Sequence, residues 1–196
     1  FLLFNDEVKN VTIRNCNFIL PYNTSQVAAI RRNSAVTQPC DSLFITNNYF
    51  TGGYYATYLY GTAANTCTNI FIDSNFIRNT YYYGFYNYYA NASYKDNTVI
   101  RDSVLNTSNY YFYGIYAYYS KGDITGNRIL QKETTTTRYT YGIYTYYHNS
   151  TGSTNNMIAN NDIVLHPMGA YYGIYSSYSR CDIWFNSIHM ISHNTG

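Results

Sequence analysis

One tyrosine-rich phrase recurs along this 196-residue chain, and its spacing constrains the fold more than any other feature. Four close copies, YGFYNYY, YGIYAYY, YGIYTYY and YGIYSSY, begin at Tyr83, Tyr113, Tyr141 and Tyr172. A degenerate copy, YATYLYG, begins at Tyr55, and a more distant one, AAIRR, begins at Ala28. A period of about 30 residues is typical of solenoids, in which each repeat forms one unit that stacks on the next.

A second phrase, Ile-x-x-Asn-x followed by an apolar residue, accompanies the first. Its copies start at Ile13, Ile45, Ile72, Tyr94, Ile124, Ile158 and Ile183, so successive starts are 22 to 34 residues apart. Cys16 replaces the asparagine in the first copy. The asparagines themselves are Asn48, Asn75, Asn97, Asn127, Asn161 and Asn186. Because a turn asparagine can bond the backbone of a neighbouring coil, we expect these residues to form a structural ladder.

Both phrases alternate with a period of two and are rich in Ile, Tyr, Phe and Thr, which predicts short strands and no helix. Repeats of this length with two or three strands each fit the coils of a parallel β-helix, in which every strand pairs with its counterpart one coil away. We therefore expect an all-β fold of about seven coils, forming a single domain over residues 1–196. Neither end reads as a cap, so we expect uncapped ends and a segment of a longer solenoid.

The pairing of G-I-Y-x-Y-x-S with I-x-x-N-x-I resembles the phrasing of the parallel β-helix repeat family, which includes pectin-lyase-like and NosD-like proteins. The resemblance covers the chain from about Val11 to Ile191. It implies a right-handed β-helix. It implies no single function, because the family contains sugar-cleaving enzymes, sugar binders and passive surface stalks.

Two of the four cysteines stand at equivalent positions of neighbouring repeats. Cys40 and Cys67 each lie five residues before the anchor Ile of their repeat, so we expect them on adjacent coils. Rungs ~4.8 Å apart fall within the Cα separation that a disulfide accepts, which predicts a Cys40–Cys67 disulfide. The alternative is a pair of buried free thiols. A disulfide would indicate an extracellular or cell-surface protein.

Composition and charge exclude some partners. Only 11% of the residues are charged and the net charge is +2, so nothing favours nucleic acid. No apolar run approaches the ~18 residues of a membrane span. Candidate glycosylation sites are the sequon asparagines Asn10, Asn23, Asn91, Asn106 and Asn149, and the serines Ser42 and Ser103 in Asp-Ser-apolar triplets.

Candidate catalytic residues are sparse. Sugar-cleaving β-helices need crowded carboxylates, or calcium-binding aspartates beside a basic residue. The best cluster comprises Asp73, Lys95, Asp96, Arg101 and Asp102 on two adjacent coils. Cross-strand pairing of Asp73 with Lys95 explains its closest pair without catalysis. We therefore expect no enzyme, cofactor or metal site, and keep a lyase or hydrolase of acidic glycans as the alternative.

The tyrosines remain to be explained, 28 in all. Counted from the glycine of each phrase, the second and fourth residues should face outward. They are Tyr58, Tyr60, Tyr86, Tyr88, Tyr116, Tyr118, Tyr144, Tyr146 and Tyr175. The fifth residue of each phrase should turn inward at a corner; these are Tyr89, Tyr119, Tyr147 and Tyr178.

Such a paved face has three interpretations: ring contacts that support the sheet, a lateral protein contact, or glycan stacking on the rings. We favour the protein contact. The sequence then indicates a structural subunit of a secreted bacterial stalk, adhesin or extracellular filament. Its partners would be other copies of itself or flanking β-helix segments, and glycans.

Overall fold

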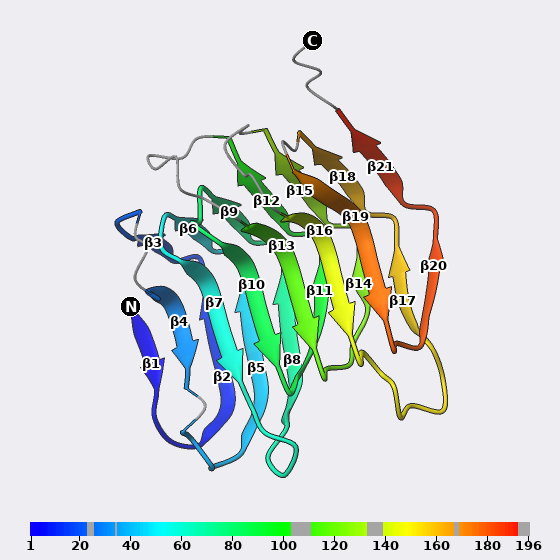
Figure 1. Cartoon of the computed structure of the whole chain (residues 1–196). Coiled ribbons are helices and arrows are strands. Elements are labelled where there is room, and N and C mark those ends of the chain that lie inside the picture. The colour runs from blue at the N-terminus through cyan, green and yellow to red at the C-terminus, as the bar shows by residue number, and fades with distance from the viewer. Residues whose placement is uncertain (23–25, 34, 103–110, 133–138, 167–168, 192–196) are drawn as a thin grey trace.

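The computed structural model describes residues 1–22, 26–33, 35–102, 111–132, 139–166 and 169–191, and the regular secondary structure within them is entirely β-strand. Twenty-one strands wind through about seven coils, and counterpart strands of successive coils form three parallel seven-stranded sheets (Figure 1). The stack advances from the blue N-terminal coil to the red C-terminal coil. The predicted all-β parallel solenoid is thus confirmed.

Sheet A is built from the tyrosine phrases. Its strands in order are β1 (Leu2–Phe4), β4 (Ala28–Arg32), β7 (Tyr55–Tyr60), β10 (Tyr83–Tyr88), β13 (Tyr111–Tyr118), β16 (Tyr139–Tyr146) and β19 (Ala170–Ser177). The copies align in register, so that Tyr86 pairs with Tyr58 on one side and with Tyr116 on the other. The repeated phrase therefore places identical side chains above one another.

Sheet B contains the first half of the second phrase. Its strands are β2 (Val8–Arg14), β5 (Cys40–Thr46), β8 (Cys67–Asp73), β11 (Ala90–Lys95), β14 (Ile124–Thr125), β17 (Asn156–Ala159) and β20 (Cys181–Trp184). The anchor residues stack as expected: Ile72 pairs with Ile45 below and with Tyr94 above. All three of these side chains are buried.

Sheet C follows the ladder asparagines. Its strands are β3 (Asn17–Ile19), β6 (Tyr49–Thr51), β9 (Phe76–Arg78), β12 (Thr98–Arg101), β15 (Arg128–Gln131), β18 (Asp162–Leu165) and β21 (Ser187–Met190). The core lies between the three sheets and contains columns of one apolar residue per coil, such as Ile77, Val99 and Ile129. At Gly114 an added Cβ would lie 2.6 Å from the carbonyl oxygen of Gly142, so sheet A approaches its neighbours too closely for a side chain there. No helix of the described residues is long and apolar enough to cross a membrane.

The predicted asparagine ladder runs along the turn between sheets B and C. In one rung, Asn97 Nδ2 donates to Ile72 O at 2.8 Å and to Asn127 Oδ1 at 2.9 Å, while Asn97 Oδ1 accepts from the backbone N–H of Asn75 at 3.0 Å. The amide therefore joins three coils. Cys16 has no amide oxygen, but its N–H still donates to Asn48 Oδ1 at 3.0 Å.

A left-handed residue precedes every rung of the ladder. These residues are Asn15, Asn47, Ser74, Asp96, Gly126, Asn160 and Phe185, with φ between 51° and 67°. The left-handed backbone makes the sharp turn that points the next side chain into the stack. Most of these positions carry Asn, Asp, Ser or Gly, the short residues that tolerate or favour such turns.

We predict that Asn97→Ala lowers the stability of the chain by roughly 2–6 kcal/mol, because the buried N–H of Asn75 and the carbonyl of Ile72 lose their side-chain partner, at about 1–3 kcal/mol each. Unfolding in urea, followed by circular dichroism, measures the change. Asn155 is the matched control: its side chain is exposed and donates to Asp182 Oδ1 at 2.7 Å. Asn155→Ala should stay within about 0.5 kcal/mol of the parent. Equal effects of the two substitutions would contradict the ladder's role.

The predicted disulfide is wrong, although the register behind it is right. Cys40 and Cys67 sit on adjacent coils, one residue before the paired Asp41 and Thr68, but both thiols are free. In-register side chains of a parallel stack run side by side at about the strand spacing of ~4.8 Å, whereas a disulfide needs Cβ atoms about 3.5–4.5 Å apart. The two thiols instead form a hydrogen bond that, with burial, raises the pKa of Cys67. The disulfide therefore no longer supports an extracellular location.

We expect that iodoacetamide in denaturant, without reductant, alkylates all four cysteines of the chain. Under native conditions Cys16 should react, because it is exposed, whereas Cys40 and Cys67 should not, because they are 2% and 0% exposed. Intact mass and peptide mapping report the result. Two cysteines that react in denaturant only after reduction would show a disulfide and contradict the structure.

Candidate functional site

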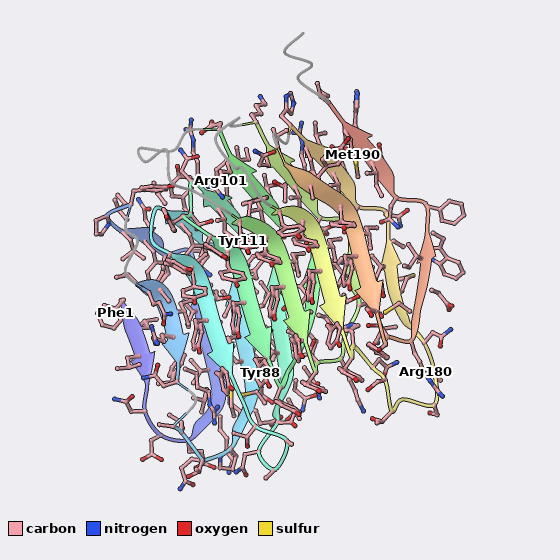
Figure 2. All side chains as sticks on the ribbon, viewed as in Figure 1. Phe1, Tyr88, Arg101, Tyr111, Arg180 and Met190 are labelled. Carbon is pink, nitrogen blue, oxygen red and sulfur yellow. The ribbon has the colours of Figure 1, made fainter. Side chains whose placement is uncertain are left out.

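The outer face of sheet A carries the predicted tyrosines as two stacked columns. In the first column, Tyr58, Tyr86, Tyr116, Tyr144 and Tyr175 have ring centroids 4.8–4.9 Å apart and planes within 8° of parallel. The second column, formed by Tyr60, Tyr88, Tyr118 and Tyr146, has spacings of 4.5–5.1 Å. Ring side chains crowd this face in Figure 2, where Tyr111 and Tyr88 lie toward opposite ends of the strands. The structure therefore brings all nine predicted residues together.

A further column, which the sequence analysis missed, lies beside these two. It comprises Tyr55, Tyr83, Tyr113, Tyr141 and Tyr172, at spacings of 4.8–5.1 Å. Both Gly84 and Phe85 are buried, so the alternation slips by one residue and Tyr83 faces the same way as Tyr86. The two rings meet edge to face at 5.1 Å. The tyrosine that opens every copy of the phrase was the sequence signal for this column. Simple alternation of inward and outward residues cannot predict that this tyrosine faces outward.

The expected inward turn of the fifth tyrosine is wrong. Tyr89, Tyr119, Tyr147 and Tyr178 have φ of 46–50° and stack outside the core at 4.7–4.8 Å. The residues that face inward are the third ones of each phrase, such as Ala117 and Thr145, both fully buried. A left-handed residue directs two consecutive side chains outward where the chain leaves sheet A. That conformation costs about 1–2 kcal/mol for a residue with a side chain, and ring pairs of about 0.5–1.5 kcal/mol offset it.

Stacking decides which part of each tyrosine meets solvent. Inside a column, both faces of a ring are covered by the rings one coil above and below, as Tyr116 is by Tyr86 and Tyr144. Ring edges and hydroxyl groups are left to form the surface. Even the lower end of the first column is covered, because the Arg31 guanidinium lies 4.7 Å from the Tyr58 ring centre. A sugar therefore finds no free ring face within the columns.

The tyrosines of this face are uncharged at neutral pH, and the Arg31 guanidinium is the charged group at the end of the first column. Burial, followed by the neighbouring phenols, raises the pKa of Tyr88 and of Tyr144 to about 12. Burial raises the pKa of Tyr83 and Tyr116 further still. The hydroxyl groups thus keep their protons and remain both donors and acceptors. A protein surface can bury such a face without burying a charge.

The structure does not unite the residues of the catalytic alternative. Asp73 and Lys95 pair in register on sheet B, as expected, and Lys95 Nζ lies 3.9 Å from Asp96 Oδ2. Arg101 lies in sheet C with its side chain fully buried, and it donates to the carbonyl oxygen of Tyr111 at 3.1 Å. The guanidinium and the carboxylates therefore belong to different surfaces of the coil.

The candidate glycosylation sites differ in exposure. Asn10 is exposed and Asn91 is partly exposed, so both remain candidates. Asn149 is 5% exposed and its Nδ2 donates to Thr154 O at 2.5 Å, which is incompatible with a folded-state acceptor. Ser42 Oγ bonds Asp41 at 3.0 Å. The sites outside the described residues are Asn23, Asn106 and Ser103.

His148 forms a buried polar contact at the corner between sheets A and B. Its Nδ1 lies 2.9 Å from Ser120 Oγ and its Nε2 lies 2.9 Å from Gly122 O. The carbonyl can only accept, so Nε2 carries the proton and Nδ1 accepts from the serine. Burial is the main cause that lowers the pKa of His148 to about 4. The neutral imidazole thus joins the turn that contains His148 to the preceding turn, which contains Ser120 and Gly122.

We predict that stability falls as the pH drops from about 6.5 to about 4, because the unfolded chain binds a proton at His148 in this range and the folded chain does not. A depression of about two and a half pH units corresponds to roughly 3 kcal/mol. Urea unfolding of the parent and of His148→Asn across this range measures the effect, and the substitution should flatten the slope. His189→Asn, on exposed β21, is the control and should not change it. If the free energy of unfolding depends on pH equally in the parent and in His148→Asn, the pH dependence does not come from His148 and the prediction is refuted.

No protein-family model, curated protein or solved structure matches this chain.

Proposed function

We propose that this chain is a structural segment of a secreted bacterial stalk, adhesin or extracellular filament of the pectin-lyase-like, NosD-like β-helix type. Its tyrosine face makes the lateral contact, and its location is extracellular or on the cell surface. The observation that carries the proposal is the continuous, uncharged tyrosine surface of sheet A, with stacked columns on at least four coils. Stalks and filaments need flat faces that repeat along their length.

A second copy of the chain is the favoured partner. The columns form ridges of ring edges and hydroxyl groups, and a second tyrosine face has the same ridges at the same spacing. Tyrosine is enriched in protein interfaces because its ring is apolar while its hydroxyl can keep a hydrogen bond. Glycan contact through the hydroxyl groups is the weaker alternative, since the ring faces of the column interiors are already covered.

Hydrolysis or elimination on acidic glycans remains the second candidate class, but no observation favours it. Of the two basic residues in the predicted cluster, Lys95 stays beside Asp73 and Asp96, whereas Arg101 is buried in sheet C and donates to the carbonyl oxygen of Tyr111.

The test is the triple variant Tyr86→Ser, Tyr116→Ser and Tyr144→Ser. The four stacked pairs of the first column are lost, together with edge-to-face contacts to the neighbouring column. We therefore expect stability to fall by at least about 2–6 kcal/mol, at about 0.5–1.5 kcal/mol per stacked pair. Self-association, followed by analytical ultracentrifugation and electron microscopy, should be abolished while circular dichroism still reports the β-fold. The triple Tyr→Phe variant keeps the stacks and loses only hydroxyl groups, and we expect weakened association with an unchanged fold.

The control removes the aromatic pair on sheet B, Phe44 and Phe71, which stack at 5.1 Å on a different face. Phe44→Ser with Phe71→Ser should leave association unchanged. A tyrosine variant that folds and associates like the parent would refute the contact face. If the serine variant unfolds, the phenylalanine variant decides the matter: unaltered association would again refute the proposal.

A further inference from the structure

Two adjoining hollows lie where the chain turns from sheet A into sheet B, beside the column of Tyr89, Tyr119 and Tyr147. Each has a volume of about 250 Å³. The first is lined by Tyr89, Tyr119, Tyr147, Asn91, Lys121 and Ser150, among others. The second is lined by Asn69, Asn91, Ser93, Lys121 and Asn156, among others. Asn91 and Lys121 belong to both, so the hollows form one corner groove.

The wall of the corner groove is the column of left-handed tyrosines. Tyr89 and Tyr119 stack at 4.7 Å and 4°, and Tyr119 and Tyr147 at 4.8 Å and 6°. Stacking again covers their faces and leaves edges and hydroxyl groups toward the groove. An aromatic edge carries positive potential and a phenol is a hydrogen-bond donor, so this wall favours an electron-rich ligand.

Lys121 supplies a full positive charge between the hollows. It is exposed and forms no ion pair with any residue of the described ranges, whereas Lys9 and Lys95 of sheet B lie beside Glu7 and Asp96. None of the residues lining the groove is acidic. The charge of Lys121 is therefore available to a ligand.

Two carboxylates stand near the margins of the groove, and both are already hydrogen-bonded. Asp123 Oδ1 accepts from the backbone N–H of Met157 at 2.8 Å. Asp41 Oδ1 accepts from Thr68 Oγ1 and from Asn69 Nδ2, each at 2.7 Å. These bonds hold both groups in place within the protein, and neither lies within ion-pair distance of Lys121.

We infer that the corner groove binds an acidic saccharide, one that carries a carboxylate or a sulfate. The ammonium group of Lys121 would meet the anionic substituent. The amide of Asn91 and the hydroxyl groups of Ser93, Ser150 and the tyrosines would meet the sugar hydroxyls. Two hollows on either side of one cation suit neighbouring sugars of a chain better than a lone inorganic anion.

The experiment measures binding of three oligosaccharides of equal length by isothermal titration calorimetry: one carboxylated, one sulfated and one neutral. Intact mass first confirms that Asn91 carries no glycan of its own, since a glycan there would fill the groove. We expect the neutral oligosaccharide to bind at least about tenfold more weakly than the better acidic one, as loss of a charged hydrogen bond predicts. The ratio of the dissociation constants of the carboxylated and the sulfated oligosaccharide identifies the substituent that the groove prefers. Binding should also weaken as salt is raised.

Lys121→Gln should lower the affinity for the acidic oligosaccharide by about tenfold or more, and Lys121→Arg should restore most of it. Lys95→Gln is the matched control on the neighbouring coil and should leave binding unchanged. Tyr119→Phe, which keeps the stack and removes one donor, should weaken binding. The inference is overturned if no acidic ligand binds, if the neutral one binds equally well, or if Lys121→Gln has no effect. Self-association should be the same in Lys121→Gln and in the parent. A failure of the saccharide-binding test therefore leaves the proposed tyrosine contact face untouched, and a failure of the association test leaves the groove untouched.

Discussion

Hydrogen bonds between successive coils hold this structure together, and they can be completed only when the coils stack in register. The asparagine ladder is the strictest case. Asn97 bonds the carbonyl of Ile72 one coil below and the amide of Asn127 one coil above, at a site with no access to water. A buried amide that loses its partners costs more than its bonds contribute, so a slipped coil is strongly disfavoured.

Register explains the tyrosine face. Because strands of one sheet stand ~4.8 Å apart, equivalent tyrosines must stack ring on ring, and the observed spacings of 4.8–4.9 Å follow. Stacking hides the ring faces and exposes edges and hydroxyl groups. The proposed lateral contact and the acidic-saccharide groove both use this edge chemistry. They differ in charge, since the flat face is neutral and the groove includes Lys121.

Several features of the site could be predicted from the sequence and others could not. The columns of Tyr86 and Tyr88 follow from alternation and repeat spacing alone. The column of Tyr83 was missed because two consecutive residues, Gly84 and Phe85, both face the core. Tyr89 was misplaced because its left-handed backbone reverses the alternation at the corner. In both cases the direction of a side chain depended on a local backbone irregularity that no pattern of apolar residues encodes.

The sequence by itself determined the coil, its register, the asparagine ladder and the identity of the residues that stack, because equivalent positions of a parallel repeat must coincide in space. Only the tertiary structure decided how those neighbours interact. The thiols of Cys40 and Cys67 meet as predicted but stay free, since parallel side chains keep the strand spacing. The side chain of Arg101 does not join Asp73 and Asp96 because Arg101 belongs to a strand of sheet C. The corner groove likewise exists only where left-handed turns connect sheets A and B. The repeat pattern of the sequence does not specify the backbone dihedral angles of these turns.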